Sequence, residues 1–109
     1  MAWIVRDGDV LASAEVACTG RARRRGLLSR DGFDGALVLR PCRSVHTLFM
    51  RFPIDVAFCD REGNVLRTCC LRPWRLSPIV KRAGFAIEAE AGAFERWRLA
   101  PGDRLEGKD

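Results

Sequence analysis

Short, mainly apolar runs recur along most of the chain, and they are separated by stretches that contain glycine, proline or aspartate. Short and frequent strands separated by such turn signals are typical of β-sandwiches and barrels. The pattern therefore predicts a mainly β fold, a sandwich or barrel of short antiparallel strands. We expect strands at residues 3–6, 10–18, 36–39, 45–50, 54–59, 65–71, 85–90 and 104–106.

Tight turns and two short helices are predicted between these strands. Asp7-Gly8 can take the positive φ angles of a hairpin turn, and residues 60–64 form a second hairpin connection. Thr19 is a suitable N-cap for a helix over residues 20–29. A second short helix is expected over residues 92–99.

Composition limits the class of protein. With 109 residues and 48% hydrophobic content, the chain is expected to form one globular domain over residues 1–109. No apolar run reaches the length of a membrane span, and Arg6, Asp7 and Asp9 interrupt the apolar N-terminal stretch, so neither membrane association nor export is expected. Five cysteines without a CxxC spacing indicate a reducing compartment, which predicts a cytoplasmic protein.

Four motifs occur in a fixed order. Residues 23–30 read RRRGLLSR, residues 45–66 read VHTLFMRFPIDVAFCDREGNVL, residues 87–92 read IEAEAG and residues 101–105 read PGDRL. From Thr19 onward the chain resembles the domain of unknown function 192 family, which comprises small bacterial and archaeal proteins. The resemblance implies a compact β-sandwich or barrel. It implies no catalytic residue, because the family has no agreed activity.

One position departs from that family. Its members usually read GLM where this chain has Gly26-Leu27-Leu28. Leucine conserves the volume of methionine and removes only a thioether, so the change alters little.

The only histidine and two isolated strand carboxylates mark a candidate site. His46 and Asp55 lie in apolar segments, where a polar group without a partner opposes folding. If the two segments pair, the carboxylate could orient the imidazole as in a general base. The competing interpretation is structural, with Asp55 bonded to a backbone group after Phe52-Pro53 or to an arginine. We expect a polar cluster that could bind a small anionic or carbonyl-bearing ligand, formed by Arg23, Arg30, His46, Asp55 and Glu88.

Two other functions stay open. An enzyme could use His46 with Asp55 as a general base, or with Cys42 as a nucleophile pair, although no oxyanion hole is evident. Cys42 and His46 lack the ligand spacing of a zinc site, so we expect no metal and no cofactor.

The second alternative is an interaction protein that binds acidic partners or nucleic acid. Seventeen of the nineteen basic residues are arginine, and residues 21–25 form a basic cluster. That cluster contains no aromatic residue for stacking on bases and no known motif, so nucleic acid is not an expected partner. The oligomeric state stays open.

Overall fold

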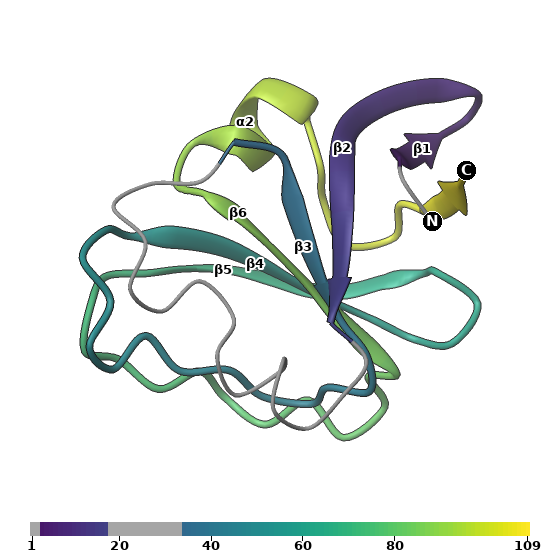
Figure 1. Cartoon of the computed structure of the whole chain (residues 1–109). Helices are drawn as coiled ribbons and strands as arrows, with labels where there is room; N and C mark the ends of the chain where they lie inside the picture. Colours follow the sequence, from purple (N-terminus) through teal and green to yellow (C-terminus); the bar gives the residue numbers. More distant parts are fainter. Residues whose placement is uncertain (1–2, 18–33) are drawn as a thin grey trace.

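The computed structural model describes residues 3–17 and 34–109 (Figure 1). Seven strands form one sheet in the order β5-β4-β6-β3-β2-β1-β7, and this confirms the mainly β class. The elements are β1 (Trp3–Arg6), β2 (Asp9–Ala17), β3 (Ala36–Leu39), β4 (Ile54–Cys59), β5 (Val65–Leu71), β6 (Phe85–Glu90), α2 (Ala93–Trp97) and β7 (Glu106–Lys108). No helix among these residues is long and apolar enough to cross a bilayer.

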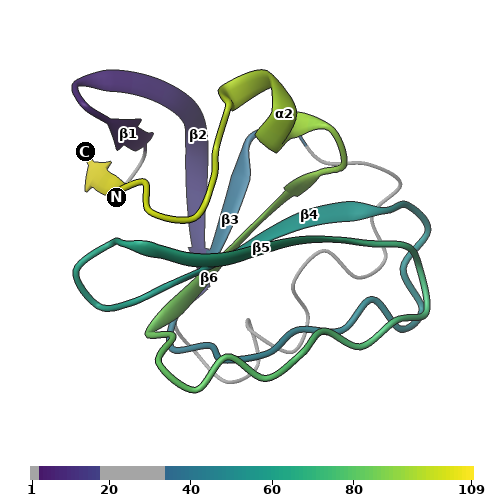
Figure 2. The ribbon, with the colours of Figure 1, turned by 180° about the vertical axis from the view of Figure 1, so that it is seen from behind.

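The sheet is mixed, because β2 and β3 run parallel while all other neighbours are antiparallel. Only antiparallel strands had been expected. β2 is shared between two halves: residues 9–13 pair with β1 and residues 14–17 pair with β3. Strand direction turns strongly between β1 and β4, as Figures 1 and 2 show. A strand that serves two halves in this way is typical of the corners of folded-over sheets.

Each face of the sheet carries its own hydrophobic cluster. All six residues of β4 are buried because both faces are covered, and its side chains alternate between the two clusters. The first cluster contains Phe94 and Leu99 and packs beneath α2. The second cluster contains Met50 and Phe52 from the chain that follows β3. The coverage of both faces explains why the strands read as nearly continuous apolar runs.

Local sequence signals account for most of the turns. Asp7 and Gly8 both have positive φ, 51° and 84°, and they join β1 to β2 as predicted. The β4–β5 hairpin is also confirmed, with Gly63 at φ 93° in its turn. The helix predicted over residues 20–29 lies outside the described residues.

Two strand predictions were wrong in detail. Residues 45–50 form a loop with one isolated bridge, from His46 to Leu76, because Phe49 has φ 65° and cannot continue a strand. The last strand lies at residues 106–108 rather than 104–106. Arg104 makes a single bridge to Asn64, and the Leu105 N–H donates to the Gly63 carbonyl, so regular pairing begins only afterwards.

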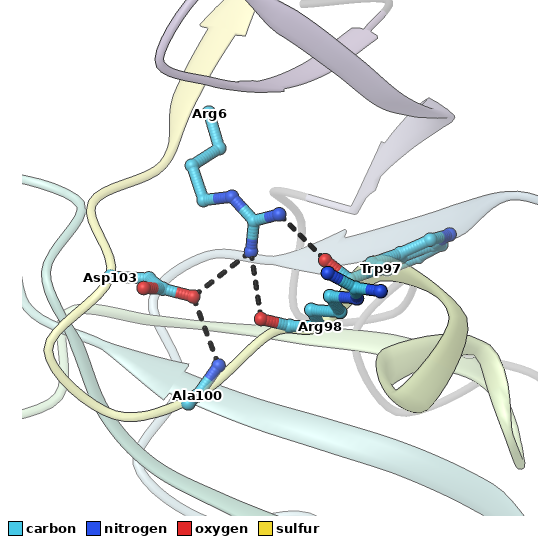
Figure 3. Close-up of polar contacts among 5 residues, drawn as sticks. All are labelled: Arg6, Trp97, Arg98, Ala100 and Asp103. Atoms are coloured by element: carbon cyan, nitrogen blue, oxygen red, sulfur yellow. Dashed lines mark hydrogen bonds and ion pairs between the residues drawn. The ribbon is translucent and has the colours of Figure 1, made fainter.

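Arg6 joins β1 to the end of α2 (Figure 3). Its guanidinium donates to the carbonyls of Trp97 (2.6 Å) and Arg98 (3.0 Å) and to the carboxylate of Asp103 (3.0 Å). Asp103 in turn accepts the Ala100 N–H at 3.0 Å. The last carbonyls of a helix lack hydrogen-bond partners within the helix. A cation at that end can donate hydrogen bonds to them and interacts favourably with the helix dipole. We assign this cluster a structural role.

Candidate functional site

Two loops lie side by side across the second face of the sheet, and we call residues 43–50 and 72–80 together the loop layer (Figure 2). The Ser77 N–H donates to the Val45 carbonyl at 2.9 Å, and the Val80 N–H donates to the Arg43 carbonyl at 2.8 Å. The inner side of the layer packs Val45 and Val80 against the second hydrophobic cluster. The loops are therefore held to each other and to the sheet.

Thr47 is the buried centre of the loop layer and has no exposed surface. Its hydroxyl donates to the Arg72 carbonyl and accepts the Arg75 N–H at 2.8 Å. Its backbone N–H donates to the Arg75 carbonyl, and its carbonyl accepts the N–H groups of Trp74 and Met50. One side chain and one peptide unit thus fix both loops.

We expect Thr47→Val to lower the free energy of unfolding by about 2 kcal/mol, because valine keeps the shape of threonine but leaves the Arg75 N–H and Arg72 carbonyl without partners. Urea denaturation measures the change. Thr68→Val on β5 is the control. Faster hydrogen exchange at the Arg75 amide should accompany the loss, and a variant as stable as the control would show that the hydroxyl contributes nothing.

An exposed aromatic pair lies on the outer side of the loop layer. The ring centroids of Phe49 and Trp74 are 4.5 Å apart, with an interplanar angle of 57°. Both residues have φ 65°, in the left-handed region. That conformation costs roughly 1–2 kcal/mol for each residue with a Cβ. Side chains that are 66% and 55% exposed recover little of this cost through burial.

Asp55 is buried, as predicted, and it bonds to the backbone. Its Oδ2 accepts the N–H groups of Gly92 (2.9 Å) and Phe94 (3.1 Å) at the start of α2. Cys70 lies opposite Asp55 on β5, and burial together with a hydrogen bond to Asp55 raises the pKa of the Cys70 thiol. The carboxylate caps a five-residue helix that has no side-chain cap of its own. Asp55 therefore bonds to backbone groups of a distant segment, Gly92 and Phe94, rather than to groups near Phe52-Pro53.

His46 is exposed on the loop layer. Its Nδ1 accepts the N–H of Leu48 at 3.2 Å, and no hydrogen bond joins it to Asp55 within the described residues. The Cys42 thiol donates to the Ser44 carbonyl at 3.1 Å. In residues 3–17 and 34–109, no group of three histidine, cysteine, aspartate or glutamate side chains is arranged to hold a metal ion.

Glu88 lies on β6 with 3% of its surface exposed. Its strand neighbours are Leu37 on β3 and Val56 on β4, which both belong to the second hydrophobic cluster. No hydrogen bond or ion pair links Glu88 to another described residue, and burial raises the pKa of its carboxyl to about 7. The predicted partners Arg23 and Arg30 lie outside the described residues.

A basic cavity of about 320 Å³ lies at one end of the loop layer. Four cationic side chains line it, and none of them forms an ion pair with another residue of the described ranges. These four are Arg43, Arg61, Lys81 and Arg82, and the remaining lining residues are Pro41, Asp60, Glu62, Ala83 and Gly84.

Two carboxylates, Asp60 and Glu62, also line this cavity, and the turn holds Asp60 in place through hydrogen bonds. Asp60 accepts the N–H groups of Glu62 and Asn64 and the Asn64 side-chain amide, at 2.9–3.0 Å. These bonds, led by the Asn64 side chain, lower the pKa of Asp60. Gly84 allows a close backbone approach, because a Cβ there would lie 3.1 Å from the Arg61 nitrogen. Asp60 thus shapes the turn, while the cations face the cavity.

Sequence reasoning missed the cavity and the aromatic pair. The cavity residues come from three separate segments, and no motif links them. Phe49 stands in a strand-like pattern that gives no sign of its positive φ. Trp74 lies in a loop between two prolines and is exposed.

The comparisons with known proteins agree with the fold and the motifs. The family model DUF192, Uncharacterized ACR, matches residues 2–107. The chain belongs to the DUF192 family. A UPF0127 protein of Pyrococcus abyssi is 36% identical over 97 residues, which cover 84% of this chain and 83% of that protein. A UPF0127 protein of Pyrococcus furiosus is 40% identical over 63 residues, 58% of this chain and about half (54%) of the relative's length.

Two solved structures share the fold of this DUF192 chain. A Sinorhizobium meliloti protein, whose name proposes a transcription regulator, superposes with a TM-score of 0.80 at 22% identity, covering 96% of this chain and 90% of that one. A protein of unknown function from Novosphingobium aromaticivorans superposes with a TM-score of 0.77 at 18% identity, covering 88% and 75%. At these identities the likeness concerns the fold alone.

Proposed function

We propose that this DUF192 protein is a binding module for a small anionic ligand, and that the ligand occupies the basic cavity. The observation that carries the proposal is the convergence of Arg43, Arg61, Lys81 and Arg82 on one hollow without ion pairs among the described residues. Cations of one sign gathered in a concave site attract carboxylates and phosphates, and arginine binds such planar groups in a bidentate way.

The surroundings favour a small ligand with an apolar part. A second hollow of about 320 Å³ shares Pro41, Arg61 and Gly84 with the basic cavity and adds Arg40 and Phe85. The Arg40 guanidinium lies 4.6 Å from the centre of the Phe85 ring. Apolar walls beside a few polar groups are the usual form of small-molecule sites.

The proposed ligand is small and anionic, as expected from the sequence, but the proposed site lies away from His46 and Asp55. Asp55 uses Oδ2 to cap α2, and His46 is exposed on the loop layer. The cavity lies instead at Arg61, in the turn after β4, and at Lys81 and Arg82, just before β6.

Titration with inorganic phosphate and with pyrophosphate, followed by amide chemical shifts, tests this proposal. We expect saturable shifts at Arg61, Lys81 and Gly84, with pyrophosphate binding more tightly because it carries more charge. Arg61→Gln combined with Lys81→Gln should weaken binding about tenfold or more.

Arg67→Gln, an exposed arginine on β5, is the matched control and should bind like the unaltered protein. The absence of saturable shifts in the unaltered protein would overturn the proposal. Equal affinities of the double variant and the control would also overturn it.

A further inference from the structure

Large apolar side chains are exposed together on the outer side of the loop layer. Leu76 and Ile79 are 73% and 72% exposed, and the rings of Phe49 and Trp74 are 66% and 55% exposed. Four of the seven large exposed apolar residues in the described part of the chain thus come from these two loops. Clusters of this kind on a soluble domain usually mark a binding surface.

The backbone holds the two residues that carry these rings close together. Phe49 and Trp74 both keep a left-handed backbone, and the Thr47 carbonyl accepts the N–H of Trp74 from below. Strain kept at an exposed position has no packing benefit, and such strain gathers at functional sites. The geometry therefore preserves a pre-formed aromatic platform.

The two segments that carry this platform contain basic residues and no acidic residue. The chain contains no aspartate or glutamate from residue 41 to residue 54, or from residue 72 to residue 87. Arg75 is adjacent to Trp74, and Arg72 precedes it by two residues. In all, the two stretches carry six basic side chains besides His46: Arg43, Arg51, Arg72, Arg75, Lys81 and Arg82.

We propose that the loop layer binds single-stranded nucleic acid, with bases stacked on Phe49 and Trp74 and phosphates held by the neighbouring arginines. Non-specific single-strand binding combines an aromatic platform with a cationic surface in this way. From the sequence, nucleic acid was not expected at residues 21–25, which lack aromatic residues. At the loop layer the aromatic and basic residues occur together.

Other occupants fit these observations less well. A second copy of the loop layer would bring its three arginines, Arg43, Arg72 and Arg75, against the same three cations. Insertion into a bilayer requires no particular geometry between two rings, whereas stacking of bases requires exposed aromatic faces. Leu76 and Ile79 extend the apolar surface beyond the rings, where sugars and base edges can contact it. This proposal goes beyond the small-anion function and does not depend on it.

Fluorescence anisotropy with a labelled oligothymidylate and a labelled oligouridylate, each roughly 12 nucleotides long, tests the proposal. We expect binding at about 50 mM salt that weakens steeply by about 200 mM. Phe49→Gly and Trp74→Gly should each reduce the affinity about tenfold. Glycine accommodates φ 65°, so both variants should unfold at the same urea concentration as the unaltered protein or at a higher one.

Two controls separate this proposal from others. Val10→Ser removes an exposed apolar residue outside the loop layer and should leave binding unchanged. Arg61→Gln alters the basic cavity and lies outside the loop layer. A loss of oligonucleotide binding in this variant, together with unchanged binding in the two glycine variants, would overturn the proposal. It would also fail if no oligonucleotide bound at the lower salt. Aromatic-dependent binding only to phosphatidylserine vesicles, or aromatic-dependent self-association in sedimentation, would likewise assign the surface to another occupant.

Discussion

Replacing Asp55 with alanine is expected to lower the free energy of unfolding by about 3 kcal/mol. The substitution leaves the N–H groups of Gly92 and Phe94 without their acceptor, and the Phe94 N–H is buried. α2 has only five residues and cannot be stable without its contacts to the sheet. Urea denaturation gives the size of the loss.

Two further variants sharpen the Asp55 experiment. Asp55→Asn keeps one oxygen that can accept a hydrogen bond, so it should cost less than the alanine variant. Glu106→Gln, at an exposed position on β7, should change stability by less than about 0.5 kcal/mol. If Asp55→Ala unfolds like Glu106→Gln, the carboxylate is not the cap that its geometry indicates.

The second large effect concerns the pH dependence of stability. Burial raises the pKa of Glu88 to about 7 from an ordinary value of 4.5. Well below pH 4.5 the carboxyl is protonated in both the folded and the unfolded chain, so its ionisation does not change the free energy of unfolding. As the pH rises to about 7, the unfolded chain releases the proton first, so stability falls. Above that range the full penalty is of the order of 3 kcal/mol.

Glu88→Gln removes the ionisation and should therefore remove this loss. We expect the variant to exceed the unaltered protein in stability by about 2–3 kcal/mol near pH 8 and to differ by less than about 1 kcal/mol near pH 5. Denaturation in urea at both pH values measures the difference. Ile87→Val, a packing change on the same strand, should cost about 1 kcal/mol at either pH. A glutamine variant with the same relative stability at both pH values would show that Glu88 does not couple ionisation to folding.

The local sequence pattern was sufficient to predict an element where neighbouring residues determine the backbone conformation. The Asp7-Gly8 hairpin and the β4–β5 hairpin follow from turn residues between alternating strands, and both are confirmed. Residues 45–50 are a similar short, mainly apolar run and yet form a loop. Their backbone partners lie around Arg75, nearly thirty residues away, and a local pattern cannot reveal such partners.

The candidate site shows the same limit. The sequence indicated that a carboxylate at position 55 would need a partner, and the structure supplies one in the N–H groups of Gly92 and Phe94. The sequence alone could not show that this partner is a helix terminus rather than His46. The basic cavity unites Arg43, Arg61 and Lys81 only after folding. Residue type indicates which groups need partners, whereas topology decides which partners they meet.

β2 gives its first half to β1 and its second half to β3. If the hydrogen bonds between β2 and either neighbour break, β2 also becomes less well held for its other neighbour. Melting of the chain should therefore be cooperative, and circular dichroism and tryptophan fluorescence should report a single coincident transition.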